Sequence, residues 1–211
     1  MPSIMKPNQV DIDSLVYSEP KINSLGGQTV FVNMPDRNKL RINTPKCKLP
    51  FGISEYNSKF SLQLSLQGLS EQMQDFKTFI SKLDEKNIEM GSKYSTKWFK
   101  KNLVKDTVKE LYNPILKQTN PNYPPNIKVK LPFRDDTFLG EVFDLNRNII
   151  SLNDITKGCY VEAIIELSGV YFVAKEFGIS WKVIQLKIYP SENIKGYAFI
   201  EDESDNSDVE P

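Results

Sequence analysis

Residues 59–67 read Lys59-Phe-Ser-Leu-Gln-Leu-Ser-Leu-Gln67, and this stretch decides the fold class. Phenylalanine and leucine alternate with serine and glutamine, which is the period of a β-strand with one buried face and one polar face. Gly68 ends the alternation, and Ser70 stands where a helix N-cap is expected. The stretch therefore predicts a strand that leads directly into a helix.

Helical periodicity follows the strand. The apolar residues after Ser70 recur at helical spacing and fall on one face; they are Met73, Phe76, Phe79, Ile80 and Leu83. A shorter helix is predicted over residues 103–112, ahead of Asn113-Pro114. These two segments form a helical insertion over about residues 70–113.

Two further strands are predicted at residues 160–167 and 179–189. In the second, strict alternation assigns Ile184, Leu186 and Ile188 to the core and places Trp181 on the opposite, polar face. The order of strands, helices and strands predicts an α+β fold, and an OB-fold-like antiparallel β-barrel with a helical insertion is the leading candidate. The predicted organisation is an extended N-terminal arm (1–25), an OB-fold-like domain (26–200) and an acidic disordered C-terminal tail (201–211).

The composition argues against an enzyme. The 211 residues include no histidine, which removes His-based nucleophile–base pairs and the usual His-containing zinc sites. Neither phosphate-binding glycine motif is present. Cys47 and Cys159 are far apart in sequence and are predicted to be reduced and buried. We therefore predict no catalytic activity, no metal and no cofactor.

Hydropathy indicates a soluble protein. No stretch approaches the roughly 18 apolar residues of a transmembrane helix, and the N-terminus lacks the apolar run of a signal peptide. A cytosolic or nuclear location is predicted, without a membrane partner.

The charges are unevenly distributed. The chain has 27 basic and 27 acidic residues, but residues 201–211 carry six acids and no base, which leaves 27 bases against 21 acids in the body. The tail acids are Glu201, Asp202, Glu203, Asp205, Asp208 and Glu210. Such a tail either regulates the binding of a polyanion to the basic body or only keeps the protein soluble.

Basic and aromatic residues occur together in the body. Ten bases and two acids lie between residues 92 and 134, with aromatic residues among them, and a second basic stretch begins at residue 37. Cations that follow a phosphate backbone and rings that stack on bases are what single-stranded nucleic acid requires. The candidate nucleic-acid-binding residues are Arg37, Lys39, Arg41, Lys97, Trp98, Lys100, Lys101, Lys128, Lys130, Trp181, Gln185 and Lys187.

Both tryptophans admit a second interpretation. Trp181 is either a stacking platform on the sheet surface or a residue that packs under the helix or the arm. Trp98, in Lys97-Trp-Phe-Lys-Lys101, either stacks on bases or anchors a helix with lysines at its rim.

A family resemblance adds to these observations. The segments Gly158-Cys-Tyr-Val-Glu-Ala-Ile-Ile-Glu-Leu-Ser-Gly-Val-Tyr-Phe-Val173 and Phe177-Gly-Ile-Ser-Trp-Lys-Val-Ile-Gln185 resemble the C-terminal half of a family in nucleo-cytoplasmic large DNA viruses. That family is similar to the short-tailed coliphage single-stranded-DNA-binding protein. The resemblance implies an OB-fold, a replication or recombination role and an acidic tail. The phage-type tail ends in an aromatic residue, whereas this chain ends Val209-Glu210-Pro211, so no terminal aromatic contact is carried over.

The predicted function is a viral single-stranded-DNA-binding protein for DNA replication, recombination or repair, located in the host cell cytoplasm, in a viral factory, or in the nucleus. Predicted partners are single-stranded DNA and, through the acidic tail, a viral polymerase or helicase; self-association stays open. Two alternatives stay open as well. One is a non-catalytic replication or transcription accessory factor that binds a protein or duplex DNA, and the other is an RNA-binding OB protein.

Overall fold

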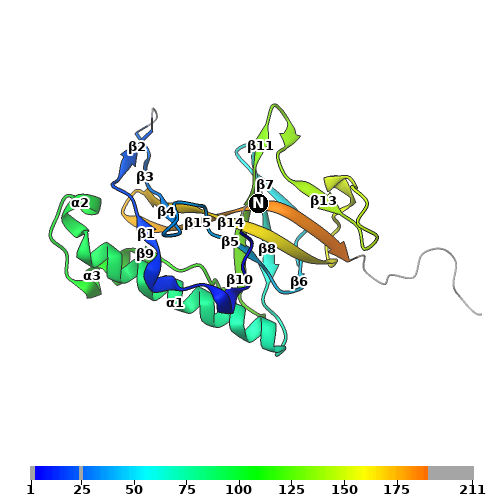
Figure 1. Ribbon diagram of the computed structural model, residues 1–211, viewed down its shortest axis with the longest axis horizontal. Coiled ribbons are helices and arrows are strands. Elements are labelled where there is room, and N and C mark those ends of the chain that lie inside the picture. Colours follow the sequence, from blue (N-terminus) through cyan, green and yellow to red (C-terminus); the bar gives the residue numbers. More distant parts are fainter. Residues whose placement is uncertain (1–2, 24–25, 190–211) are drawn as a thin grey trace, which may run out of the picture.

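The computed structural model describes residues 3–23 and 26–189. It is a mixed α+β structure in which two long strands cross the molecule and one long helix runs alongside them (Figure 1). The predicted tail, residues 201–211, and the predicted domain end at residue 200 lie outside the described residues.

The α-helices of the described residues interrupt the strands at one place in the chain, which confirms the predicted helical insertion. The α-helices are α1 (Glu71–Lys93), α2 (Ser95–Phe99) and α3 (Lys105–Leu111). Three short 3-10 helices are also described: η1 (Pro7–Gln9), η2 (Ile12–Ser14) and η3 (Leu152–Asp154).

The strands differ widely in length. The long pair is β14 (Tyr160–Val173) and β15 (Glu176–Tyr189), and β8 (Lys59–Ser65) and β10 (Asn126–Leu131) are intermediate. The short strands are β1 (Val16–Tyr17), β2 (Lys21–Ile22), β3 (Gln28–Val30), β4 (Val32–Asn33), β5 (Arg41–Asn43), β6 (Cys47–Lys48), β7 (Ile53–Tyr56), β9 (Tyr112–Asn113), β11 (Phe133–Arg134), β12 (Thr137–Phe138) and β13 (Glu141–Phe143).

Five strands, β15, β10, β8, β6 and β14, are linked by pairing in a closed series. β15 pairs with β10 in parallel, and β10 pairs with β8 antiparallel. β8 pairs with β6, β6 with β14, and β14 with β15, all antiparallel. Following these pairings from β15 leads back to β15, so the sheet curves around a shared interior.

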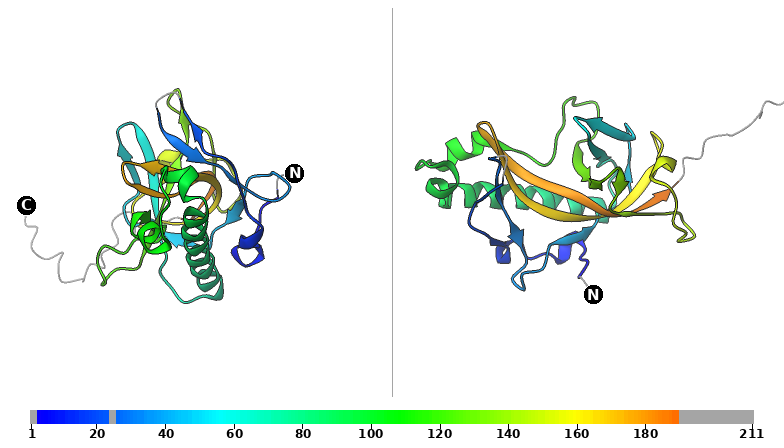
Figure 2. Two further views of the ribbon diagram at one scale, coloured as in Figure 1. Left: turned by 90° about the vertical axis from the view of Figure 1, so that its left-hand side faces the viewer. Right: turned by 90° about the horizontal axis from the view of Figure 1, so that it is seen from above.

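The predicted strand at residues 59–67 and the helix after it are confirmed. Leu62, Leu64 and Leu66 are fully buried, and Ser70 Oγ accepts a hydrogen bond from the backbone N–H of Met73 at 3.3 Å, which caps α1. The apolar face predicted for α1 is buried throughout. The helix lies along β14 and β15 in two perpendicular views (Figures 1 and 2).

The predicted faces of residues 179–189 are partly wrong. The pairing of β14 with β15 shifts register between Ile164 and Ile165, which pair with Gln185 and Val183. The extra residue, Ile184, forms a bulge that reverses which side chains face inward. Trp181 and Val183 before the bulge therefore share the core with Leu186 and Ile188 after it.

Both tryptophans are core residues, so the packed alternative is confirmed for each and the surface stacking position is wrong. Trp181 is 1% exposed, and its ring meets Phe79 of α1 edge-on at 6.2 Å. Trp98 is 4% exposed and lies in an aromatic cluster that joins α2 to the far end of the β14–β15 hairpin. Its ring is 5.6 Å from Phe172 and 6.2 Å from Phe177. Each ring is closed off from an incoming base.

A second bulge in β14 depends on a glycine. The register shifts again between Leu167 and Gly169, and Gly169 has φ +135°. A Cβ at this position would stand 2.5 Å from the carbonyl oxygen of Val30. Glycine therefore allows β3 to approach β14 closely.

The N-terminal arm is fastened to α1. Tyr17 Oη donates a hydrogen bond to Asn87 Oδ1 at 3.0 Å, and Lys86 Nζ pairs with Asp13 at 3.0 Å. These contacts hold the described part of the arm against the helix.

Candidate nucleic-acid interface

The outer face of β8 and β10 carries the polar residues of both strands. Lys128 lies opposite Gln63, and Lys130 lies opposite Ser61. Lys130 also pairs with Lys182 on β15. Paired residues on neighbouring strands point to the same face, so these three lysines lie together on the outer surface of three strands.

A cavity of about 420 Å³ lies over this face, and we call it the lysine groove. Its lining residues are mostly basic, polar or aromatic, with no acid among them: Tyr56, Ser58, Lys59, Phe60, Ser61, Lys128, Lys130, Leu131, Pro132, Phe133, Ser168 and Lys182. Tyr56 is 75% exposed, and the rings of Phe60 and Phe133 contact each other with centroids 4.4 Å apart. The groove thus combines cations with an accessible aromatic ring.

The lysines of the groove act on one another. The pKa of Lys130 is lowered, first by desolvation of its ammonium group and then by the positive charges of Lys59 and Lys128. Unneutralised cations that repel each other favour the binding of an anion, because the anion relieves that repulsion.

A buried carboxylate stands at one end of the groove. Glu166 on β14 is 4% exposed and pairs with Arg41 at 2.7 Å and with Lys182 at 3.0 Å. Burial alone would raise the pKa of Glu166, but hydrogen bonds from Lys182 and Arg41 outweigh burial and hold this pKa below its usual value. The pKa of Lys39 is lowered, mainly by desolvation; the charge of Glu166 raises this pKa and the charge of Lys182 lowers it. Arg41, Lys182 and Lys39 therefore extend the positive surface from β15 toward β5.

The structure does not bring all the sequence-predicted residues together. Lys128 and Lys130 lie in the groove, Arg41 and Lys39 lie beside it, and Arg37 occupies an exposed turn with φ 68°.

The lysines around α2 lie elsewhere. Lys97 pairs with Glu19 at 2.6 Å, and Lys100 Nζ donates to the backbone carbonyl of Lys97. Lys101 is exposed just after α2. Figure 1 and the right-hand view of Figure 2 place α2 at the end of the molecule away from β7.

Gln185 and Lys187 belong to a pocket of mixed charge. Gln185 Nε2 donates to Glu141 at 2.7 Å, and the same pocket also contains Asp144, Arg147 and Glu162. The pKa of Lys187 is raised, mainly by its hydrogen bond with Tyr189 and then by the charge of Glu162. These acids offset the positive charge at this place.

Sequence reasoning missed three residues of the groove: Tyr56, Lys59 and Lys182. Lys59 and Tyr56 pair across the β7–β8 hairpin, which the sequence could have indicated through the Asn57-Ser58 turn. Lys182 was missed because the bulge at Ile184 was not foreseen. Before the bulge, Trp181 and Val183 face the core, so the residue between them, Lys182, faces outward.

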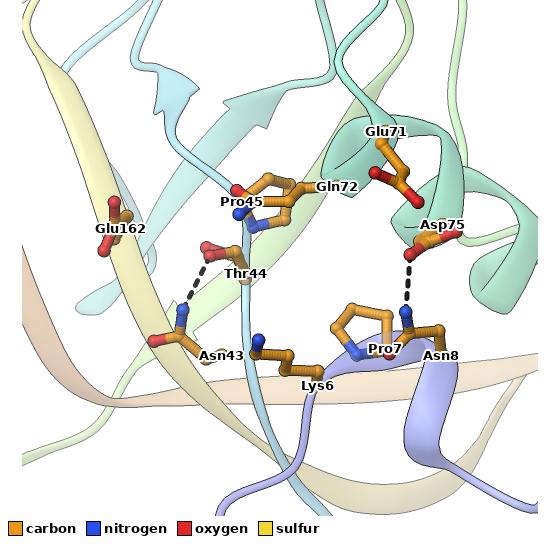
Figure 3. Close-up of a pocket in the computed structure, with 10 residues that line it drawn as sticks. All are labelled: Lys6, Pro7, Asn8, Asn43, Thr44, Pro45, Glu71, Gln72, Asp75 and Glu162. Carbon is orange, nitrogen blue, oxygen red and sulfur yellow. Dashed lines mark hydrogen bonds between the residues drawn. The ribbon is translucent and has the colours of Figure 1, made fainter.

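A second cavity, of about 380 Å³, has the opposite character (Figure 3). It lies between η1, α1 and the residues after β5, and Glu71, Asp75 and Glu162 line it together with Lys6. Asn8 Nδ2 donates to Asp75 at 2.7 Å. Three acids against one lysine make this pocket unfavourable for phosphate, in contrast to the lysine groove, whose lining contains no acid.

Other kinds of site find little support in residues 3–23 and 26–189. These residues contain no group of three or more Cys, Asp or Glu side chains placed to hold a metal ion. None of their helices combines the length and the apolar character that crossing a membrane requires. Cys47 and Cys159 are both buried and unbonded.

A family model matches residues 61–201, and its description is a family of unknown function, DUF5871. The chain belongs to this family. The matched range includes most of β8, the helical insertion and the β14–β15 hairpin, and therefore most of the lysine groove. A curated relative is the uncharacterized protein L291 of Acanthamoeba polyphaga mimivirus, which is 27% identical over 188 residues. The match covers 82% of this chain, but the chain spans only 31% of that relative.

Solved structures of phage proteins are also similar to this chain. The single-stranded DNA-binding protein from bacteriophage Enc34 gives a TM-score of 0.43 at 16% identity, covering 92% of this chain and 99% of that one. The structure of that phage protein in complex with single-stranded DNA gives a TM-score of 0.41 at 15% identity. The match covers 84% of this chain and 97% of the phage chain. Gp2.5, a single-stranded DNA-binding protein encoded by bacteriophage T7, gives a TM-score of 0.49 at 10% identity. The match covers 74% of this chain and 98% of gp2.5.

Proposed function

We propose that this protein binds single-stranded DNA, without catalysis, along the outer face of β8, β10 and β15. One observation carries the proposal: Lys59, Lys128, Lys130 and Lys182 line one groove with the exposed ring of Tyr56, and no acid lines that groove. Ammonium groups neutralise phosphates, and an exposed ring offers a stacking face that every base can use.

We further propose that the circuit of β15, β10, β8, β6 and β14 is the barrel of an OB-fold. In this proposal the outer face of the barrel strands binds the ligand. Helix α1 of the insertion packs against buried side chains of the sheet, for example Phe79 against Trp181. A role in viral DNA replication, recombination or repair, in the host cytoplasm or nucleus, belongs to the same proposal.

The test is a titration of fluorescent oligo-dT, oligo-U and a duplex of equal length at several salt concentrations. Lys59, Lys128 and Lys130, together with the one net positive charge of Arg41 and Lys182 around Glu166, can neutralise about four phosphates. The slope of log K against log salt should therefore be about −2.8, at ~0.7 per phosphate on a single strand. Preference for the duplex would indicate an accessory factor, and preference for oligo-U an RNA-binding protein. Either result would contradict the proposal.

A pair of variants locates the interface. Lys128→Gln with Lys130→Gln should weaken binding and make the slope shallower by about 1.4, because two phosphate contacts are lost. Lys101→Gln with Lys105→Gln removes the same charge from exposed positions near α2 and α3, away from the groove. Equal losses in both variants would show that net charge alone is responsible and that the groove is not the interface.

A further inference from the structure

A further pocket lies at the other end of β8 and β10 from the lysine groove. It has a volume of about 690 Å³, within the usual range for a small-molecule site. Phe51 and Tyr123 line it although they are 57% and 67% exposed. Two large aromatic side chains that remain this exposed beside one cavity offer flat faces to a ligand.

The polar groups of this pocket suit the edge and the phosphate of a nucleotide. Lys48 and Lys157 supply positive charge, and no acid lines the pocket. Asn126 also lines it, and its carboxamide oxygen is buried without a hydrogen-bond partner among the described residues. A buried polar atom without a partner costs free energy, which a ligand that supplies a hydrogen-bond donor would recover.

The pocket and the lysine groove lie along the same pair of strands, β8 and β10. Asn126 and Ser65, which line the pocket, are paired across β10 and β8. The next outward pair is Lys128 with Gln63, and the one after it, Lys130 with Ser61, lies in the groove. From Ser65 to Ser61 the strand advances roughly 14 Å at ~3.4 Å per residue. One nucleic-acid strand can therefore reach both places along a single acid-free face.

We propose that this pocket, with Phe51 and Tyr123 as its rings, holds an unpaired base of the strand whose phosphates lie along the lysine groove. The inference rests on the proposed function and adds a site to it. In this arrangement Lys48 and Lys157 contact the flanking phosphates, and Asn126 contacts the edge of the base. A pocket of this kind binds bases, whereas the groove binds mainly phosphates.

The test separates bases from phosphates. Oligo-dT of about 12 nucleotides and an abasic strand of equal length carry the same charge but differ in their bases. Wild-type protein should prefer oligo-dT, and Phe51→Ala with Tyr123→Ala should reduce this preference at least about fivefold, the lower end of the effect of one stacking ring. The salt slope should not change. Leu69→Ala with Val104→Ala is the control, since both residues are exposed and lie outside the pocket.

The outcomes distinguish the two proposals. If the wild type binds neither strand, or binds both without salt dependence, the proposed function fails. If the wild type binds with the expected slope and the Phe51/Tyr123 variant keeps the full preference for oligo-dT, only the base site fails. A third outcome concerns an isolated peptide of residues 201–211. If the Phe51/Tyr123 variant no longer binds this peptide but keeps the full preference for oligo-dT, the pocket binds an acidic peptide instead of a base, and the inference is overturned.

Discussion

Trp181 shows how one side chain joins the helix to the sheet. Its ring is buried against Phe79 of α1, and its position on β15 is three residues before the bulge at Ile184. Trp181→Ala should destabilise the protein by about 3–5 kcal/mol, the usual cost of removing a large aromatic side chain from a core. Urea unfolding followed by circular dichroism measures this loss.

The same variant also tests the corrected face. Under conditions where Trp181→Ala remains folded, its affinity for oligo-dT should equal that of the wild type, because the ring does not reach the outer surface. A loss of affinity with unchanged stability would instead mean that the indole is exposed in solution and stacks on bases.

At the scale of elements, Asp84 connects α1 to the segment that follows α3. The hydroxyl of Tyr112 and the backbone N–H of Ile115 both donate to its carboxylate. Burial raises the pKa of Asp84 to about 6, although these hydrogen bonds oppose the shift. The carboxylate is therefore a contact between elements whose strength depends on pH.

The sign of this dependence follows from linkage. Because the folded protein holds the Asp84 proton more tightly than the unfolded chain does, stability falls as pH rises from about 4 to about 6. The contribution is on the order of 3 kcal/mol, at about 1.4 kcal/mol per pH unit. Asp84→Asn keeps an acceptor oxygen and removes the titration, so the wild type should lose stability relative to this variant across that interval. Parallel pH dependences in urea unfolding would contradict the assignment.

Regular elements were predictable and irregular ones were not. The periods of residues 59–67 and of α1 correctly place Leu62, Leu64, Leu66 and the apolar face of the helix in the core. The period of residues 59–67 does not predict that Ser61 and Ser65 are buried as well. In β15 the bulge at Ile184 is set by pairing with a strand about 20 residues away, and no local pattern marks it. The groove also depends on pairings of β10 with β8 and β15, which bring Lys130 beside Lys182 across about 50 residues of chain. Spacing could therefore suggest the lysines but not their grouping.

At the scale of the whole molecule, acids are unevenly distributed among the cavities that the described residues form. The lysine groove and the Phe51–Tyr123 pocket contain no acid, while the pocket beside η1 contains three. A polyanion that approaches the molecule is attracted to the first region and repelled from the second, which orients it before contact. The fold achieves this although the chain has equal numbers of acidic and basic residues.

The acidic tail completes this distribution and leads to a prediction for the full chain. Residues 201–211 carry six acids and no base, and they are covalently attached to a body with 27 bases and 21 acids. A tethered polyanion has a high effective concentration near a basic groove, so it should compete with single-stranded DNA. Removing the tail should tighten binding of oligo-dT at low salt and have little effect at high salt, where screening weakens the competition.

The comparison is between the full chain and residues 1–200, titrated at low and high salt. A matched control replaces the six tail acids with asparagine or glutamine at unchanged length, which separates charge from the bulk of the tail. If charge is the cause, the neutralised tail should behave like the truncation. Equal affinities of the full chain and the truncation at both salt concentrations would mean that the tail only aids solubility, and competition with DNA would be refuted.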